Sequence, residues 1–214
     1  MEQTGRKVLS GLVTLSTLIW AAALQAAPQD EHQRGLLALQ RGDVATAMTV
    51  LRAPAAAGHA PSQSLLAFML DRADMSAEAA RLWRSAAAQG DAEAHVGLAN
   101  LNLGGRGVAK DEKQALRHFS EAAALGHAAA IEQLATAWLT GQWGTNAEAD
   151  PAAAAAAVQR AAQQGHLPSA EALVLAHRSG RFGLAVDEAQ ASAWQVRVSA
   201  WRQQRAVAAV KGQP

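Results

Sequence analysis

The segment that decides the fold is residues 94–126, AHVGLANLNLGGRGVAKDEKQALRHFSEAAALG. Its pattern indicates a short helix over 92–103, a glycine-rich turn, and a second helix that begins at Asp111 and ends at Gly126. Aspartate is a favoured N-cap residue, and glycine readily takes the left-handed conformation that ends a helix. The segment therefore predicts two helices joined by a hinge.

The turn itself, GGRGVAKD at residues 104–111, has a second interpretation as a phosphate-binding loop. A P-loop requires glycine, four residues and then Gly-Lys-Ser/Thr between a strand and a helix, so that backbone N–H groups and the lysine converge on the anion. Gly105 and Gly107 lack this spacing to a lysine, and the pattern before them predicts no strand. We therefore interpret the loop as a hinge in which Val108 fills the turn.

A run of small residues ending in glycine recurs along the chain. The closing glycines, at spacings of 32, 36 and 39 residues, are Gly58, Gly90, Gly126 and Gly165. Each spacing suits two helices and two turns, and similarity at a regular period is the sequence signature of a repeat protein. The expected helix N-caps are Asp111, Asp150 and Asp187, with Gln114 and Gln190 as capping-box partners and Pro151 at a first helical position.

The composition agrees with an all-α fold. Half of the 214 residues are hydrophobic, and much of that half is alanine, the best helix former and a residue that lets helices approach closely. No run shows the alternation of a half-buried strand or an Asn-Gly hairpin signal. The chain has no cysteine, which excludes disulfides, catalytic thiols, thiolate metal ligands and lipid attachment to an N-terminal cysteine.

Residues 94–126 resemble a Sel1-like repeat, a family related to the tetratricopeptide repeats whose pattern runs roughly A-x3-L-G-x2-Y-x2-G-x-G-V-x2-D-x3-A-x2-W-Y-x2-A-A-x2-G. The matching positions are Ala94, Leu98, Gly105, Gly107, Val108, Asp111, Ala115, Phe119, Ala122, Ala123 and Gly126. The departures are Ala99, Asn102 and His118. The resemblance extends over about residues 39–200, with Trp83, Trp138 and Trp194 at aromatic positions of the more degenerate units.

The resemblance implies a right-handed α-solenoid of stacked antiparallel helix pairs over residues 27–214. We expect four units and an N-terminal half unit, with a capping helix over about residues 188–207. In that helix, Trp194, Val198 and Trp201 fall at i, i+4 and i+7. They predict a single apolar stripe that packs against the preceding pair.

The N-terminus predicts export of a bacterial protein. Residues 1–26 combine Arg6 and Lys7 with an apolar stretch and small residues near a cleavage point, which is typical of a secretory signal peptide. The alternative is an uncleaved membrane anchor, because about 17 apolar residues are borderline for spanning a bilayer. We expect a periplasmic protein that contacts the membrane only through this segment, if the segment stays uncleaved.

Removal of residues 1–26 leaves 17 basic and 17 acidic residues. A neutral chain is poorly suited to binding nucleic acid, so no such partner is expected. A local excess of cations follows Glu188, at Arg197, Arg202, Arg205 and Lys211. We interpret it as a solvated helix end whose cations favour the negative pole of the helix dipole.

No catalytic, cofactor or metal site is predicted. The sequence contains no G-x-S-x-G, S-x-x-K, H-x3-H or H-E-x-x-H pattern. His59, His127 and His166 occupy equivalent places in successive units, and stacking would separate them by roughly 20 Å, too far for one ion. The isolated histidines His95, His118 and His177 are interpreted as structural or surface residues.

Five residues are candidates for binding a partner. In solenoids of this family the first helix of each pair lines the concave face, and polar positions there, Asn100, Asn102 and Arg178, are candidate contacts. Trp143 in the turn GQWGTN and Phe182 in GRFG lie outside the helical stripes. Each of these two aromatic residues either folds back as a plug in the place of the family's valine or is an exposed residue of the kind enriched at binding hot spots.

The resemblance implies a non-catalytic scaffold or adaptor in the bacterial cell envelope, with a protein or peptide partner on the concave face and no cofactor. One alternative is a structural component of an envelope machine, such as a polysaccharide exporter or a flagellar motor ring. A second is a β-lactamase-like hydrolase. The lack of cysteine counts against the hydrolase, because the Sel1-like proteins with suggested penicillin binding are cysteine-rich.

Overall fold

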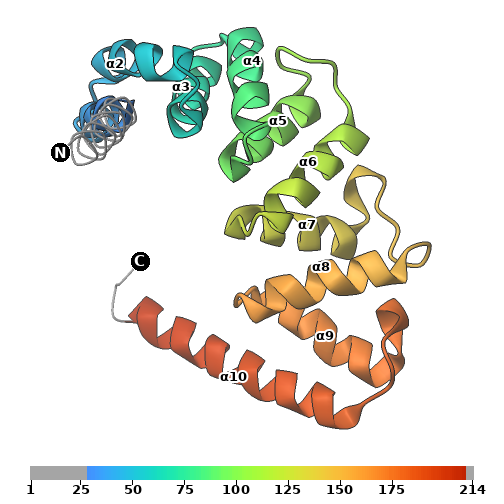
Figure 1. Ribbon diagram of the computed structural model, residues 1–214. Coiled ribbons are helices and arrows are strands. Elements are labelled where there is room, and N and C mark those ends of the chain that lie inside the picture. Colours follow the sequence, from blue (N-terminus) through green and yellow to red (C-terminus); the bar gives the residue numbers. More distant parts are fainter. Residues whose placement is uncertain (1–27, 211–214) are drawn as a thin grey trace, which may run out of the picture. The chain divides into compact units, whose positions relative to one another are not determined.

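The computed structural model describes residues 28–210, and all regular secondary structure in that range is helical (Figure 1). The all-α prediction is confirmed for this part of the chain. The signal segment predicted at residues 1–26 lies outside the described residues. Between residues 28 and 210, no helix combines the length and the apolar character needed to cross a bilayer.

The described residues form two compact units, which divide between Ala94 and His95. The described elements of the first unit are the helical residues 28–40, α2 (Val44–Ala56), α3 (Ala60–Arg72) and α4 (Ser76–Ala87). Helix α2 packs on α3, and α3 packs on α4. Leu51, Leu70 and Trp83 are buried in this unit among alanines from all of these helices.

The helix over residues 28–40 approaches α2 at Gly35. A Cβ atom at Gly35 would lie only 2.6 Å from Cγ of Leu51, whose side chain is fully buried. Glycine is therefore needed for the two helices to come this close. The described chain begins with a complete helix pair, where the sequence predicted only half a unit.

The second unit continues the same arrangement. Its elements are α5 (Ala92–Gly104), which begins in the first unit, α6 (Glu112–Ala124), α7 (Ala128–Thr140), α8 (Pro151–Gln163), α9 (Leu167–Ser179) and α10 (Glu188–Val210), with short 3-10 helices η1 (Gln142–Gly144) and η2 (Arg181–Gly183). From α6 to α10 each helix packs on the next along the chain. Sequential packing of helical hairpins is the α-solenoid arrangement that the repeat predicted.

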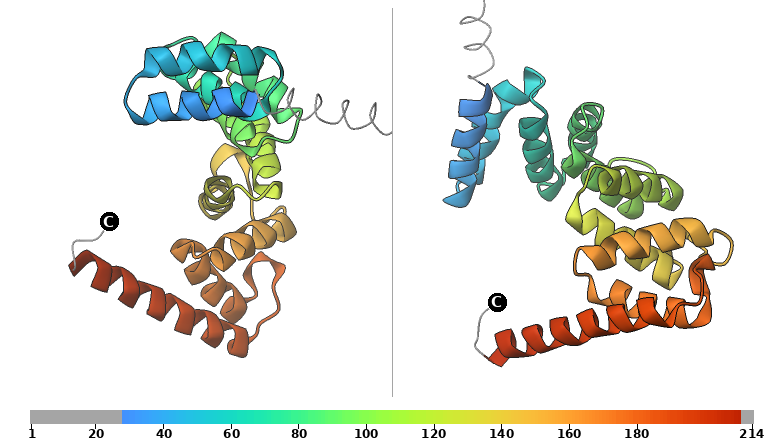
Figure 2. Two further views of the ribbon diagram at one scale, coloured as in Figure 1. Left: turned by 60° about the vertical axis from the view of Figure 1, so that its left-hand side comes forward. Right: turned by 60° about the horizontal axis from the view of Figure 1, so that its bottom comes forward.

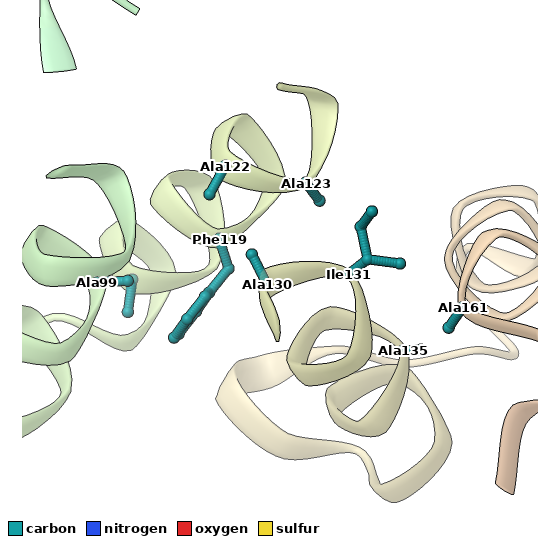
Figure 3. Packing of buried hydrophobic residues seen from close by; sticks show 9 residues of the cluster. Ala99, Phe119, Ala122, Ala123, Ala130, Ile131, Ala135 and Ala161 are labelled. Carbon is teal, nitrogen blue, oxygen red and sulfur yellow. The ribbon is translucent and has the colours of Figure 1, made fainter. Parts of the chain in front are cut away.

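A single aromatic ring fills the core around α6. Phe119 projects from α6 toward Ala99 on α5 and Ala130 on α7 (Figure 3). Its side chain is only 2% exposed, and most of its neighbours in the cluster are alanines. Alanine lets the helices pack closely, so Phe119 supplies much of the apolar volume there.

The last helix closes the second unit, as predicted. Figure 2 shows α10, in red, as one long helix beside α9. Trp194 and Val198 are buried against Leu173 and Val174 of α9, and Trp201 is half-buried at the edge of this cluster. The stripe predicted from the sequence is therefore real, but its three members are buried to different extents.

Aspartate side chains cap three of the helices as the sequence predicted. Asp111, Asp150 and Asp187 accept hydrogen bonds from the backbone N–H three residues later, at N···O distances of 2.9, 3.0 and 3.0 Å. The capping-box role of Gln114 is wrong, because its side-chain oxygen instead accepts from the guanidinium of Arg117. Helix capping therefore explains the presence of these three aspartates at the starts of their helices.

Asp111→Ala is expected to lower the free energy of unfolding by about 1 kcal/mol, because the N–H of Gln114 loses its acceptor. Asp111→Asn keeps a capping oxygen and should cost much less. Urea denaturation of the full chain, followed by circular dichroism, measures both. Equal losses for the two variants would show that the charge, and not the cap, is what stabilises the helix.

Candidate functional site

The glycine-rich turn between α5 and α6 is a hinge. Gly105 and Gly107 have φ angles of 66° and 64°, which glycine adopts readily. The N–H of Arg106 donates to the carbonyl oxygen of Leu101 at 3.1 Å, and the N–H of Asp111 donates to that of Asn102 at 2.9 Å. These N–H groups close the turn on the end of α5, so they do not converge on a shared anion site.

Asn102 is part of this hinge. Its side chain is buried, and its Nδ2 donates to the carbonyl oxygen of Ala109 across the turn at 3.3 Å. The prediction that Asn102 is a surface contact is therefore corrected: its side chain is buried, and its amide spans the turn. Asn100, on the same helix, is exposed.

Arg178, another candidate, is exposed at the end of α9. Its Nε lies 3.4 Å from the carboxylate of Glu188 at the start of α10. Both side chains are largely solvated, and such ion pairs contribute little to stability. Arg178 remains accessible to a partner.

The two candidate aromatic residues occupy turns of the same backbone conformation. Trp143 and Phe182 have φ angles of 56° and 59°, in the left-handed region that non-glycine residues adopt infrequently. Phe182 is 4% exposed and packs on Ala154 and Ala176, while the guanidinium of Arg181 lies 4.9 Å from its ring centroid. The exposed alternative is therefore wrong for Phe182, which is a plug.

Trp143 is half-buried. Its ring stacks on Phe119 with a centroid distance of 4.8 Å and an interplanar angle of 9°. Trp143 also borders a shallow hollow to which Lys110, Glu112 and Lys113 contribute charged side chains. Trp143 thus packs as a plug on the Phe119 core and remains partly exposed.

The three histidines at equivalent places in successive units lie at helix N-termini, but their side chains have different hydrogen-bond partners. His127 accepts from the N–H of Ala130 as a helix N-cap, and His59 and His166 lie at the same position with Nδ1 at 2.8 and 2.7 Å from Ser62 and Ser169 Oγ. The repeated His-x-x-Ser spacing was the available signal for the last two.

His95 and His118, isolated in the sequence, meet in space. Their Nδ1 atoms are 3.2 Å apart, so α5 and α6 bring together two imidazoles that lie 23 residues apart in the chain. No group of three or more His, Cys, Asp or Glu side chains able to hold a metal ion occurs among residues 28–210. A pair of imidazoles alone leaves a metal ion short of protein ligands.

His32 lies in the first unit beside His59, with ring centroids 5.3 Å apart, and its Nδ1 is 3.2 Å from Ser62 Oγ. Burial lowers the pKa of His32 below its ordinary value of 6.5, and the neighbouring His59 lowers it further because two imidazolium cations would repel. The folded protein therefore disfavours the charged form of His32.

Acidification is expected to destabilise the first unit through His32. The unfolded chain binds the proton more tightly, so stability is complete above the ordinary pKa and falls as the pH drops through it. The thermal midpoint should fall further between about pH 7.5 and about pH 5.5 in the native protein than in His32→Gln. The same pH dependence in both proteins would contradict this assignment.

Each unit has an apolar hollow on the surface formed by its described residues. The first, called here the first-helix hollow, has a volume of about 350 Å³ and is bordered by His32, Leu36, Pro61, Ser64, Leu65, Phe68, Asp91 and Glu93. These residues lie on the helix over 28–40, on α3 and at the start of α5. All three helices are first helices of their pairs.

The second hollow, called here the α6–α8 groove, has a volume of about 310 Å³. It is bordered by Leu116, Ser120, Ala123, Ala124, Ile131, Leu134, Trp138, Ala153, Ala156, Ala157 and Arg160. Its two sides lie on α6 and α8, which are second helices of their pairs, and α7, a first helix, lies between them. None of the five candidate residues belongs to the groove. The signal in the sequence was the alanine run of α8, which by itself indicates only a helix.

The fold matches solved structures of Sel1 repeat proteins. One is a protective antigen of uropathogenic Escherichia coli that displays the SLR fold, with 24% identity over 83% of this chain and a TM-score of 0.67. This chain spans 39% of the antigen's length. A second is a Sel1 repeat protein from Oxalobacter formigenes, with 22% identity, 83% of this chain and 75% of that chain covered, and a TM-score of 0.62. No protein-family model and no curated protein matches the sequence.

Proposed function

We propose that this chain, a solenoid with the Sel1 repeat fold, is a non-catalytic scaffold that binds a protein or peptide partner in the bacterial cell envelope. The observation that carries the proposal is the first-helix hollow, an apolar depression on helices of successive pairs. The envelope setting is supported by the signal-like pattern of residues 1–26.

The first-helix hollow has the features of a protein-binding surface. Phe68, at its border, is 43% exposed, and Leu37, on the helix that supplies Leu36 to the hollow, is 50% exposed. Large apolar side chains that gather on a surface, rather than occurring singly, mark interaction sites. Arg72, whose guanidinium lies 5.8 Å from the Phe68 ring centroid, adds a cation beside the aromatic contact.

Site-specific crosslinking in intact cells tests the proposal. A photoreactive phenylalanine analogue at Phe68 of the full chain should give discrete crosslinked protein products. The same analogue at Leu125, which is 49% exposed and outside both hollows, should not. Identical products from the two positions, or none from Phe68, would count against a partner at this hollow.

A second measurement concerns location. Export predicts that the chain is recovered in the periplasmic fraction and that its mature N-terminus begins near residue 27. An intact Met1 on a protein recovered from the cytoplasm would overturn the envelope setting and leave the binding proposal to be judged by crosslinking.

A further inference from the structure

The α6–α8 groove is built from three consecutive helices. Helices α6 and α8 each pack on α7, and α7 supplies Ile131, Leu134 and Trp138 between them. On α6 the bordering residues Leu116, Ser120 and Ala124 recur at every fourth position. Residues at this spacing lie on one face of α6, so the groove extends along about two helical turns, a length of about 11 Å.

The groove is hollow because α8 carries alanine where α4 and α6 carry long side chains. The helices can be aligned on the glycine that closes each unit, which is Gly90 for α4 and Gly126 for α6. Nine residues before this glycine, α4 has Arg81 and α6 has Arg117. Twelve residues before it, α4 has Glu78 and α6 has Gln114. The equivalent residues of α8 are Ala156 and Ala153, which border the groove. Methyl groups cannot cover the half-buried side chains of Leu134 and Trp138, so apolar surface stays accessible.

One charged side chain, Arg160, borders the groove, at the last turn of α8. It is half-buried, and its guanidinium makes no hydrogen bond or ion pair with any other residue in the described chain. Arg202, by comparison, pairs with Glu171 at 2.8 Å. A guanidinium at the edge of apolar surface favours a carboxylate, which it can bind through two parallel hydrogen bonds.

We propose that the α6–α8 groove binds a short amphipathic helix of a protein partner, whose apolar face lies on Leu134 and Trp138 and whose carboxylate pairs with Arg160. The proposal deepens the proposed scaffold function and rests on it. Alanine walls permit helix axes to approach to about 8–10 Å, and two turns of groove match the i, i+3, i+4 and i+7 positions of one helix face.

The positive charge of α10 makes this helix of a second copy of the chain a poor ligand for the groove. No acidic residue follows Glu188 in the sequence, and α10 carries three arginines, Arg197, Arg202 and Arg205, so this helix is cationic. Such a helix would place cations beside Arg160, which costs free energy when both are partly desolvated. The segment after Glu188 therefore does not supply the carboxylate, and we assign it to a different protein.

The experiment selects helical peptides of about four turns from a displayed library against the full chain, and the selected peptides are then made synthetically as probes. We expect them to share an apolar face and an aspartate or glutamate at one position. Arg160→Glu should weaken their binding about tenfold or more, because it removes one member of a charge pair. Exchanging the peptide's acid for lysine should restore binding to the Arg160→Glu protein.

Two further variants test the groove itself. Ala156→Trp should block binding by filling the groove, whereas Ala152→Trp, on the same helix and exposed outside the groove, should leave the dissociation constant unchanged. The double variant Ala153→Gln with Ala156→Gln, which gives α8 long side chains like those of α6, should also weaken binding. Circular dichroism and the thermal midpoint establish that each variant is folded.

Three outcomes would overturn the proposal. Either no peptide is selected, or the selected peptides bind the Ala156→Trp protein normally, or their dissociation constants are the same for the native and Arg160→Glu proteins. Peptides that bind normally to these variants but lose binding in Phe68→Ala would place the contact at the first-helix hollow. In that case the α6–α8 proposal fails and the proposed scaffold function stands.

Discussion

Phe119→Ala is expected to lower the free energy of unfolding by about 3–5 kcal/mol, the range for truncating a buried phenylalanine. Phe119 is 2% exposed and lies among Ala99, Ala122 and Ala130 on three helices. Alanine side chains have no rotamers with which to fill a new cavity, so the helices would have to move to close it. The substitution also removes the ring on which Trp143 stacks at 4.8 Å.

Urea denaturation of the full chain, followed by tryptophan emission, measures this loss. Leu125→Ala, at a 49% exposed position near the end of the same helical hairpin, is the matched control and should change stability by about 0.5 kcal/mol or less. Trp143→Ala should fall between the two, because it loses the stack but leaves Phe119 in place. Equal effects for Phe119→Ala and Leu125→Ala would contradict the packing described around α6.

Trp194→Ala should have an effect of similar size, about 3–5 kcal/mol, at the other end of the second unit. Trp194 is 8% exposed, packs on Leu173 and Val174, and carries the guanidinium of Arg197 4.7 Å from its ring centroid. Loss of the indole removes a large buried apolar side chain from the contact between α9 and α10. We expect α10 to separate from α9 at denaturant concentrations where α6 to α8 remain folded.

Hydrogen exchange resolved along the chain measures this separation directly. In Trp194→Ala, the amides of α10 should lose protection before those of α7 do. Trp201→Ala, a control on the same stripe, should cost less, because Trp201 is only half-buried at the cluster edge. Greater loss of protection in Trp201→Ala than in Trp194→Ala would show that α10 is held mainly by its distal half.

Local signals made the helices and hinges predictable. Asp111 and Asp187 cap helices through their own backbone neighbours, and Gly105 and Gly107 need only local conformational freedom to form the turn. The interpretation of GGRGVAKD as a hinge is confirmed because it depended on residues adjacent in the chain. The periodic positions of Trp194 and Val198 predicted the buried face of α10 for the same reason.

The candidate contacts were less predictable. The sequence predicted Asn102 as a surface contact and left Phe182 open between a plug and an exposed contact, and both are buried. Asn102 is held by Ala109 in its own turn, but Phe182 is covered by Ala154, which lies on a different helix hairpin. Sequence spacing carries no information on such distant neighbours unless they recur with the repeat.

The amino-acid order alone thus establishes the helical repeat, because helix caps, glycine turns and apolar periodicity act over a few neighbouring residues. Side-chain burial and surface shape come from the packing of helices: His95 beside His118, Trp143 on Phe119, and the α6–α8 groove all join residues far apart in the chain. The alanines of α8 illustrate the difference. On their own they favour a helix, and only the placement of α6 and α7 beside them leaves an accessible apolar groove.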